Sequence, residues 1–153
     1  DAFIQNWIDE QKIALNKNTS FLKWRLSAPE KKYEIAIARS NNKIIGYAIF
    51  CYVIKENVPS IAILDISCLK NYNNLSSSLI SKIKDYAIEN HAEIIMIMAT
   101  KHVSNSHELI KNGFFRSPYK FYLIIKNLGN SYLNSFLKKE KNWHLTWIDS
   151  DNF

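Results

Sequence analysis

The N-terminal part of the chain has apolar residues at helical spacing. Between Phe3 and Leu15 they recur at three-, four- and seven-residue intervals, which places them on one face of an α-helix of about four turns. Ser20 is a suitable N-terminal cap for a second, shorter helix, which has to end before Pro29. The pattern therefore predicts two helices ahead of the first strand.

From Tyr33 onward the apolar period changes from helical spacing to two, as in a half-buried strand. The alternation predicts three strands, at about residues 33–38, 44–54 and 61–69. Asn41 and Asn42 separate the first two strands, and asparagine tolerates the positive φ angles of a tight hairpin turn. We therefore expect these strands to form an antiparallel meander.

A helical pattern and a buried strand follow the meander. Residues 75–88 are amphipathic at helical spacing, and the apolar run 94–98 is typical of a strand that is buried on both faces. A strand, a helix and a strand in this order form a crossover. The strands at 61–69 and 94–98 are therefore expected to be parallel neighbours.

The C-terminal third predicts one more helix and two more strands. The helix covers about residues 104–112, and Gly113 is placed to be the residue just after its end. Alternating apolar residues then predict strands at 119–125 and 143–148.

The composition fits one globular domain that spans residues 1–153. The chain is 47% hydrophobic and 22% charged, close to the averages for globular proteins, and it has neither a repeat nor a low-complexity linker. No apolar run approaches the ~20 residues of a membrane-spanning helix, so we expect a soluble protein without a membrane partner. Since the first residue is Asp1 and not Met, we also allow for a longer parent protein.

The charge balance favours an anionic small ligand. Lys and Arg number 20 against 14 Asp and Glu, which gives a net charge of +6. The lysines are scattered along the chain, whereas a nucleic-acid-binding protein concentrates them on one face, so no nucleic-acid partner is predicted.

The two cysteines indicate a reducing compartment. Cys51 and Cys68 lie inside apolar strand-like runs and have neither the spacing of a redox pair nor that of a metal site. Buried, reduced thiols are the favoured interpretation, and they predict a cytoplasmic location.

The order of the predicted elements resembles that of the GCN5-related N-acetyltransferase (GNAT) superfamily over essentially the whole chain. Residues 109–114 are similar to the helix that ends in a Gly-Phe pair before the sixth strand of that family, and residues 61–87 resemble its cofactor-binding strand, loop and helix. Residues 21–25 and 143–151 are similar to a group of bacterial GNAT proteins. The resemblance implies an α/β (α+β) fold with a mixed central sheet of six to seven strands and helices on both faces.

The resemblance also implies acetyl-CoA, or another acyl-CoA, as co-substrate. In that family the fourth and fifth strands splay apart. The pantetheine arm pairs with the free edge of the fourth strand, and amides at a helix N-terminus hold the pyrophosphate. In this chain the corresponding residues form a strand edge, a phosphate loop and one position across the cleft. They are Ile66, Ser67 and Cys68; Asn71, Tyr72, Asn73, Asn74, Leu75 and Ser76; and Thr100.

The sequence departs from the family's motif at two points. Asn74 and Ser76 stand in place of the two glycines of the phosphate loop, although asparagine tolerates the αL conformation and serine is small. Leu109 stands where the family has a tyrosine general acid, and leucine cannot protonate a leaving thiolate.

Asp65 and His102 are the candidate catalytic residues. A carboxylate inside an apolar strand is costly unless it is paired or functional, and strict alternation places Asp65 on the same face as Ile61 and Ile63. Asp65 is either the base that takes the amine proton or an acceptor of hydrogen bonds from Tyr or Lys on a neighbouring strand. His102 follows the fifth strand, near the expected cleft, and is either a proton donor or a solvated loop residue.

Trp147 and Asp149 are the candidate substrate-binding residues, because an aromatic ring close to a carboxylate suits an amine-bearing or sugar substrate. The alternative is that they belong to an exposed tail. No set of His, Cys and carboxylate residues has ligand spacing, so no metal site is predicted.

Two functions are compatible with these features. The first is an N-acyltransferase that moves an acetyl or other acyl group from acyl-CoA to a primary amine of a small metabolite, sugar or peptide by direct attack. The second is a non-catalytic GNAT-like module for ligand binding or assembly, such as one half of a tandem protein, which the missing glycines and Leu109 favour. The sequence is compatible with a homodimer and leaves the acceptor open.

Overall fold

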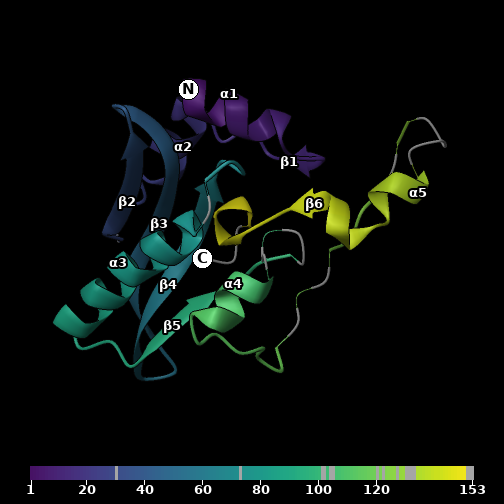
Figure 1. Ribbon diagram of the computed structural model, residues 1–153. Coiled ribbons are helices and arrows are strands. Elements are labelled where there is room, and N and C mark those ends of the chain that lie inside the picture. The colour runs from purple at the N-terminus through teal and green to yellow at the C-terminus, as the bar shows by residue number, and fades with distance from the viewer. Residues whose placement is uncertain are drawn as a thin grey trace.

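The computed structural model describes residues 1–29, 31–72, 74–100, 103, 106–119, 121, 123–126, 128–129 and 134–150. Its centre is a mixed sheet of four strands in the order β2-β3-β4-β5 (Figure 1). These strands are β2 (Tyr33–Ser40), β3 (Lys43–Lys55), β4 (Val58–Cys68) and β5 (Ile94–Ile97). Helix α1 (Ala2–Asp9) packs on one face of this sheet and α3 (Leu75–Glu89) packs on the other, so helices flank both faces.

The predicted antiparallel meander of β2, β3 and β4 is confirmed. Its first hairpin turns through Asn41 and Asn42, with φ angles of 46° and 62°, and its second through Glu56 and Asn57, with 50° and 64°. Positive φ at both central residues is the signature of a type I′ turn, whose twist matches that of the flanking strands. The sequence therefore encodes both turns locally.

The predicted crossover is also confirmed, because α3 carries the chain from β4 to a parallel β5. The pairing between these two strands is short, and joins residues 60–63 to β5. β4 continues to Cys68, so within the described part of the chain its last residues have no partner in β5. Since every residue of β5 is paired, it is the chain after Ile97 that separates from β4 before β4 ends.

Helix α1 is shorter than the predicted four-turn helix and ends at Asp9. Further along, β1 (Ile13–Ala14) pairs in parallel with β6 (Trp143–His144). Ala14 still packs against the core on the α1 side, but it does so from a strand. Apolar spacing alone could not distinguish the two conformations.

Helix α2 (Thr19–Arg25) begins before the predicted cap at Ser20. The cap is Asn18, whose side-chain oxygen accepts a hydrogen bond from the backbone N–H of Phe21 at 2.9 Å. This bond satisfies one of the amides that a helix N-terminus leaves without an intrahelical partner.

The short helix predicted before Gly113 is confirmed as α4 (Ser106–Lys111). Gly113 has a φ of 88°, and Phe114 N–H then donates to the carbonyl of Leu109 at 3.0 Å. A residue with positive φ directly after a helix closes its last turn in this way, and glycine adopts that conformation at little cost.

The prediction of six to seven strands in one sheet is wrong for the described residues. Residues 119–125 contribute no strand there, and the chain continues to α5 (Asn134–Leu137), which stands away from the sheet (Figure 1). The strand predicted at 143–148 is reduced to β6, between the 3₁₀ helices η2 (Glu140–Asn142) and η3 (Trp147–Asp149). Alternation identifies a face to bury but not the strand that pairs with it.

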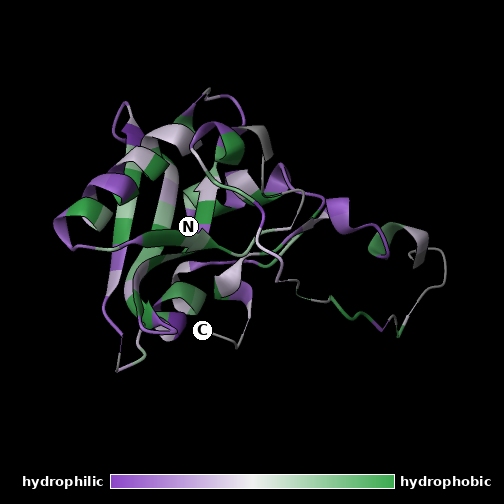
Figure 2. Cartoon of the chain, turned by 90° about the horizontal axis from the view of Figure 1, so that it is seen from below, coloured by the Kyte–Doolittle hydropathy of each residue, from purple (hydrophilic) through white to green (hydrophobic). Residues whose placement is uncertain are grey.

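The apolar side chains form two cores, one on each face of the sheet, and Figure 2 shows hydrophobic colouring concentrated in the strands. One core joins α1 to Ile49 and Leu64, and the other joins α3 to Ile61 and Ile63. Among the described residues, no helix has the length and apolar character that a bilayer crossing requires.

Candidate functional site

A β-bulge in β4 determines where its polar side chains point. Ile49 of β3 pairs with Asp65, whereas the next residue, Phe50, pairs with Ile63, so that Leu64 is an extra residue in β4. An extra residue reverses the alternation of side chains beyond it. Asp65 therefore does not share a face with Ile61 and Ile63 as predicted.

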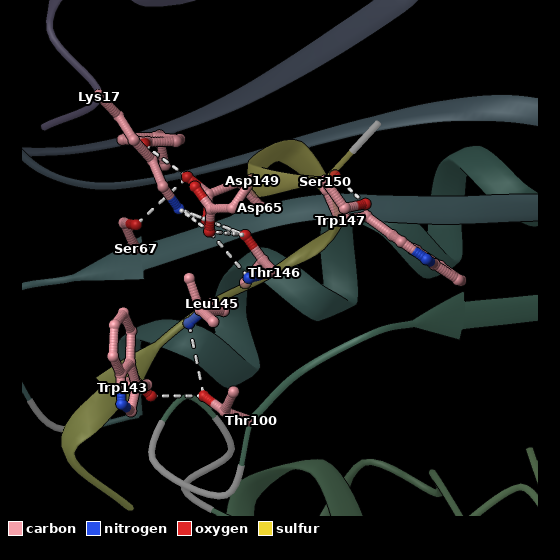
Figure 3. Close-up of polar contacts among 11 residues, drawn as sticks. Lys17, Asp65, Ser67, Thr100, Trp143, Leu145, Thr146, Trp147, Asp149 and Ser150 are labelled. Carbon is pink, nitrogen blue, oxygen red and sulfur yellow. Dashed lines mark hydrogen bonds and ion pairs between the residues drawn. The ribbon is translucent and has the colours of Figure 1, made fainter. Parts of the chain in front are cut away.

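On the α1 side of the sheet, Asp65 is fully buried and surrounded by hydrogen-bond donors. Its Oδ1 accepts from Lys17 Nζ at 2.8 Å and from Thr146 Oγ1 at 3.0 Å, and its Oδ2 accepts from the hydroxyl of Tyr47 at 2.6 Å (Figure 3). Ser67 Oγ lies 3.4 Å from the same Oδ2. These contacts support the hydrogen-bonded interpretation of Asp65, and its role as a base stays a prediction.

Lys17 is also fully buried and pairs with a second carboxylate, that of Asp149. Its Nζ lies 3.2 Å from Asp149 Oδ2 and 5.6 Å from the centre of the Trp7 ring. We call Lys17, Asp65, Thr146 and Asp149 the buried ion cluster. It joins the segment after β1 to β4 and to η3, three parts of the chain that are distant in sequence.

The two carboxyl groups of the buried ion cluster are shifted in opposite directions. Burial favours a raised pKa for Asp65, but the charge and hydrogen bond of Lys17, together with the Tyr47 hydroxyl, hold that pKa below its usual value. For Asp149, burial outweighs Lys17 and, with the nearby charge of Asp65, raises the pKa. Asp149 Oδ1 is buried and has no hydrogen-bond partner among the described residues, which agrees with this direction.

A small cavity lies on the other face of the sheet, where β4 and β5 part. Its volume is about 30 Å³, and its walls come from the ends of both strands, the first turns of α3, and α4. The lining residues are Ile66, Ser76, Ile80, Ile97, Val103, Glu108 and Leu109. This is the place where the GNAT resemblance puts the acyl-CoA cleft, but a cavity of this size holds about one water molecule.

Two of the predicted cofactor residues, Ile66 and Ser76, line this cavity. The side chain of Ser67 instead points to Asp65 on the opposite face. Burial, with the charges of Glu108 and Asp65, raises the pKa of the Cys68 thiol to about 12, so this thiol is protonated at neutral pH.

The predicted phosphate loop leads into the N-terminus of α3. Asn71 and Tyr72 are exposed, and Asn74 has the αL conformation, with φ 58° and ψ 13°, that makes glycine favourable at such a position. Leu75 is buried and packs close to Gly46 of β3, where a Cβ atom would lie 2.9 Å from Leu75 Cδ2. Asn73 lies outside the described residues.

Thr100 follows β5 and contacts the C-terminal part of the chain. Its N–H donates to the carbonyl of Leu145 at 3.2 Å, and its Oγ1 donates to the carbonyl of Trp143 at 2.6 Å. Ala99 forms an antiparallel bridge with Thr146. Thr100 is therefore placed at the point where β5 meets the segment after β6.

The candidate substrate residues Trp147 and Asp149 lie in η3 and not in an exposed tail, since the side chain of Asp149 is 2% exposed. Their role in substrate binding stays a prediction. His102 lies outside the described residues. Within the described residues, no group of three or more metal-binding side chains is present.

Sequence reasoning missed Lys17 and Glu108. Lys17 lies in a polar run between two asparagines, which resembles a solvated loop, and only its partners 48 and 129 positions away mark it. Glu108 directly precedes Leu109, so the position of the family's missing tyrosine was the signal that could have led to it.

Comparison with solved structures finds acetyltransferases. A Pyrococcus furiosus protein described as an acetyl transferase matches with a TM-score of 0.59 and 17% identity, over 69% of this chain and 73% of that one. An aminoglycoside acetyltransferase from an uncultured soil metagenomic sample, in complex with sisomicin, matches with a TM-score of 0.57 and 15% identity, over 82% and 85%. A ribosomal-protein-alanine N-acetyltransferase from Brucella melitensis biovar Abortus 2308 matches with 0.51 and 16%, over 61% and 72%.

No protein-family model matches the sequence, and no curated protein matches it significantly. At such low identities the structural matches establish the fold alone. The chain therefore has the mixed α+β fold of GNAT acetyltransferases, as its order of elements predicted, with fewer strands in the sheet.

Proposed function

We propose that this chain is an N-acyltransferase that transfers an acetyl or other acyl group from acyl-CoA to a primary amine. The observation that carries the proposal is the parting of β4 and β5 beside the N-terminus of α3, with Ile66 and Ser76 on the walls of the cavity between them. The acetyltransferase fold supports the same activity.

The N-terminus of α3 suits the pyrophosphate of the acyl-CoA. Its first turn has no acidic residue, so the unpaired amides and the positive end of the helix dipole face no negative side chain of that turn. Asn74 already has the αL conformation that brings these amides together. Both features support the assignment of the pyrophosphate to this helix N-terminus, although the family's glycines are missing.

The pantetheine arm requires more room than the cavity provides. Val103, Glu108 and Leu109 form the wall that faces β4, and two of these residues lie on α4. Acyl-CoA binding therefore requires an outward movement of α4, a helix of six residues.

The chemistry we propose is direct attack by a neutral amine on the thioester carbon. The C–N bond forms, the C–S bond breaks, the thiolate of CoA leaves, and a base takes the proton of the amine. Glu108 is the carboxylate whose side chain lines the cavity, and we assign it this role in place of Asp65, whose oxygens already accept hydrogen bonds. The protonated thiol of Cys68 does not favour a covalent intermediate on the enzyme.

The acceptor we propose is a small primary amine, which agrees with the aminoglycoside acetyltransferases among the structural matches. A cytoplasmic location remains our expectation from the reduced cysteines, both of which are free in the structure.

Calorimetry with acetyl-CoA and with desulfo-CoA tests cofactor binding directly. Heat is expected with both ligands, and a Ser76→Trp variant, which obstructs the cavity, should abolish it. If the wild-type chain gives no heat with either ligand at high protein concentration, the acyltransferase proposal is wrong.

The alternative is a non-catalytic module, which the cavity of about 30 Å³ and Leu109 on its wall favour. The variant that combines Asn74→Gly with Leu109→Tyr restores one glycine and the family's acid. A working cleft should keep or gain acyl transfer to a panel of small amines, whereas a non-catalytic module should stay inactive in both forms.

A further inference from the structure

Residues 143–149, which we call the C-terminal wedge, lie between the parted ends of β4 and β5. On the β5 side, Ala99 pairs with Thr146, and the Thr100 N–H donates to the carbonyl of Leu145. The Thr100 hydroxyl also accepts from the Leu145 N–H and donates to the carbonyl of Trp143 (Figure 3). On the β4 side, Thr146 Oγ1 donates to Asp65 Oδ1 at 3.0 Å. Thr146 therefore contacts both strands, and it is fully buried.

The charged groups of the buried ion cluster hold the wedge on the α1 side of the sheet. Lys17 Nζ lies 3.2 Å from Thr146 Oγ1 and 3.2 Å from Asp149 Oδ2, while it pairs with Asp65 at 2.8 Å. Asp149 in turn accepts from the backbone N–H of Thr146 at 2.9 Å and closes the capping box of η3. Ile148, between these two residues, is buried in the core on the α1 side. The buried ion cluster, the burial of Ile148 and the pairing of β6 with β1 thus hold the wedge in place.

Where two parallel strands are no longer paired, another segment has to supply hydrogen-bond partners for their buried backbone groups. The wedge supplies the carbonyl of Leu145 to Thr100 and accepts the Thr100 hydroxyl at the carbonyl of Trp143. These bonds take the place of a continued β4–β5 ladder, which ends at Ile63 and Ile97.

We propose that the C-terminal wedge sets the separation of β4 and β5, and that Thr146 is a positioning residue for the acyl-CoA cleft. Thr146 acts through Asp65, whose neighbour Ile66 points to the opposite face and lines the cavity. The effect of the wedge on strand separation follows from the contacts alone, whereas its effect on acyl-CoA binding rests on the proposed function.

The test compares Thr146→Val, which keeps the shape of the side chain, with Thr146→Ser, which keeps the hydroxyl. Amide hydrogen exchange, read by NMR, is the first measurement. The Thr100 amide should exchange about tenfold faster in Thr146→Val, relative to the amides of β3, and should return to the wild-type rate in Thr146→Ser. Tyr86→Leu, a change on α3 in the core on the opposite face of the sheet, where Tyr86 packs against Phe50, is the control and should leave this ratio unchanged.

The second measurement is the Kd for acetyl-CoA, which should rise about tenfold in Thr146→Val and stay near the wild-type value in Thr146→Ser and Tyr86→Leu. If the wild-type chain binds no acetyl-CoA, the proposed function fails, but the exchange measurement still decides the role of the wedge. If Thr100 exchange and the Kd are the same in Thr146→Val as in wild type, the wedge proposal is overturned.

If Thr146→Val does not fold, hydrogen exchange in the wild-type chain provides the test. In it, the Thr100 amide should be as protected as the amides that join β4 to β5. Exchange at the rate of an exposed loop would overturn the proposal just as well.

Discussion

The sharpest prediction concerns Lys17→Met. The substitution keeps an unbranched side chain of similar length and removes the only cation within hydrogen-bond or ion-pair distance of Asp65 and Asp149 among the described residues. Two buried carboxyl groups then face each other without a counter-charge. The variant should be strongly destabilised, because one partner of a buried pair has been removed and the other is left in an apolar environment.

The size of the effect follows from burial. Lys17 and Asp65 are 0% exposed and 2.8 Å apart, so the loss is that of breaking a buried pair, about 3–5 kcal/mol. This is a large part of the ~5–15 kcal/mol that folds a typical domain. At ~2–4 °C per kcal/mol for a chain of this size, the melting temperature should fall by roughly 6–20 °C.

Urea unfolding at pH 7 measures the loss, with Lys82→Met as the matched control. Lys82 is 77% exposed and lies 4.0 Å from Asp85, so its removal should cost below about 1 kcal/mol. Adding Asp65→Asn to Lys17→Met should restore part of the stability, since one of the two uncompensated carboxyl groups is then gone. A loss of under about 1 kcal/mol for Lys17→Met would refute the structural role that we assign to the buried ion cluster.

Three further predictions use other contacts. Gly46→Ala should destabilise the chain by about 1–3 kcal/mol and weaken acetyl-CoA binding, because the new Cβ lies 3.1 Å from the carbonyl of Ser67 and closer still to Leu75; urea unfolding and calorimetry test both effects. Asp149→Asn removes a carboxyl group whose pKa is raised in the folded chain. A raised pKa stabilises the folded state fully below pH 3.8, the ordinary pKa of aspartate, and this contribution is lost as the pH rises through the folded-state pKa. The stability of wild type relative to this variant, measured by urea unfolding, should therefore fall as the pH rises above about 4. Glu108→Gln should lower kcat about 100-fold with little change in the Kd for acetyl-CoA, and an equal loss in both would contradict its role as the base.

The parts of the fold that could be predicted from the sequence are those that local pattern determines. Period-two alternation and two short polar turns suffice for the meander, and an amphipathic segment between two apolar runs suffices for the crossover. The strand at 119–125 failed because the same alternation occurs in a segment whose described residues do not reach the sheet edge, and Ile124 is 91% exposed.

The candidate site was predictable in its outline and not in its side chains. The order of elements predicted a cleft beside Ile66 and Ser76; both residues line the small cavity, and their role in cofactor binding stays a prediction. The orientation of Asp65 depends on the one extra residue at Leu64, which no local pattern marks. The burial of Lys17 could not be predicted for a similar reason, since it results from contacts with distant segments.

The buried ion cluster also affects the order in which this chain can become functional during synthesis. Lys17 and Thr146 are 129 positions apart, so their contact forms only after the segment that contains Thr146 has left the ribosome. Translation at ~5–20 residues per second leaves Asp65 without Thr146 and Asp149 for several seconds after the meander has emerged. During that time an apolar strand with an incompletely paired carboxylate is open to chaperones and proteases, and slower translation of the last segment would lengthen this exposure.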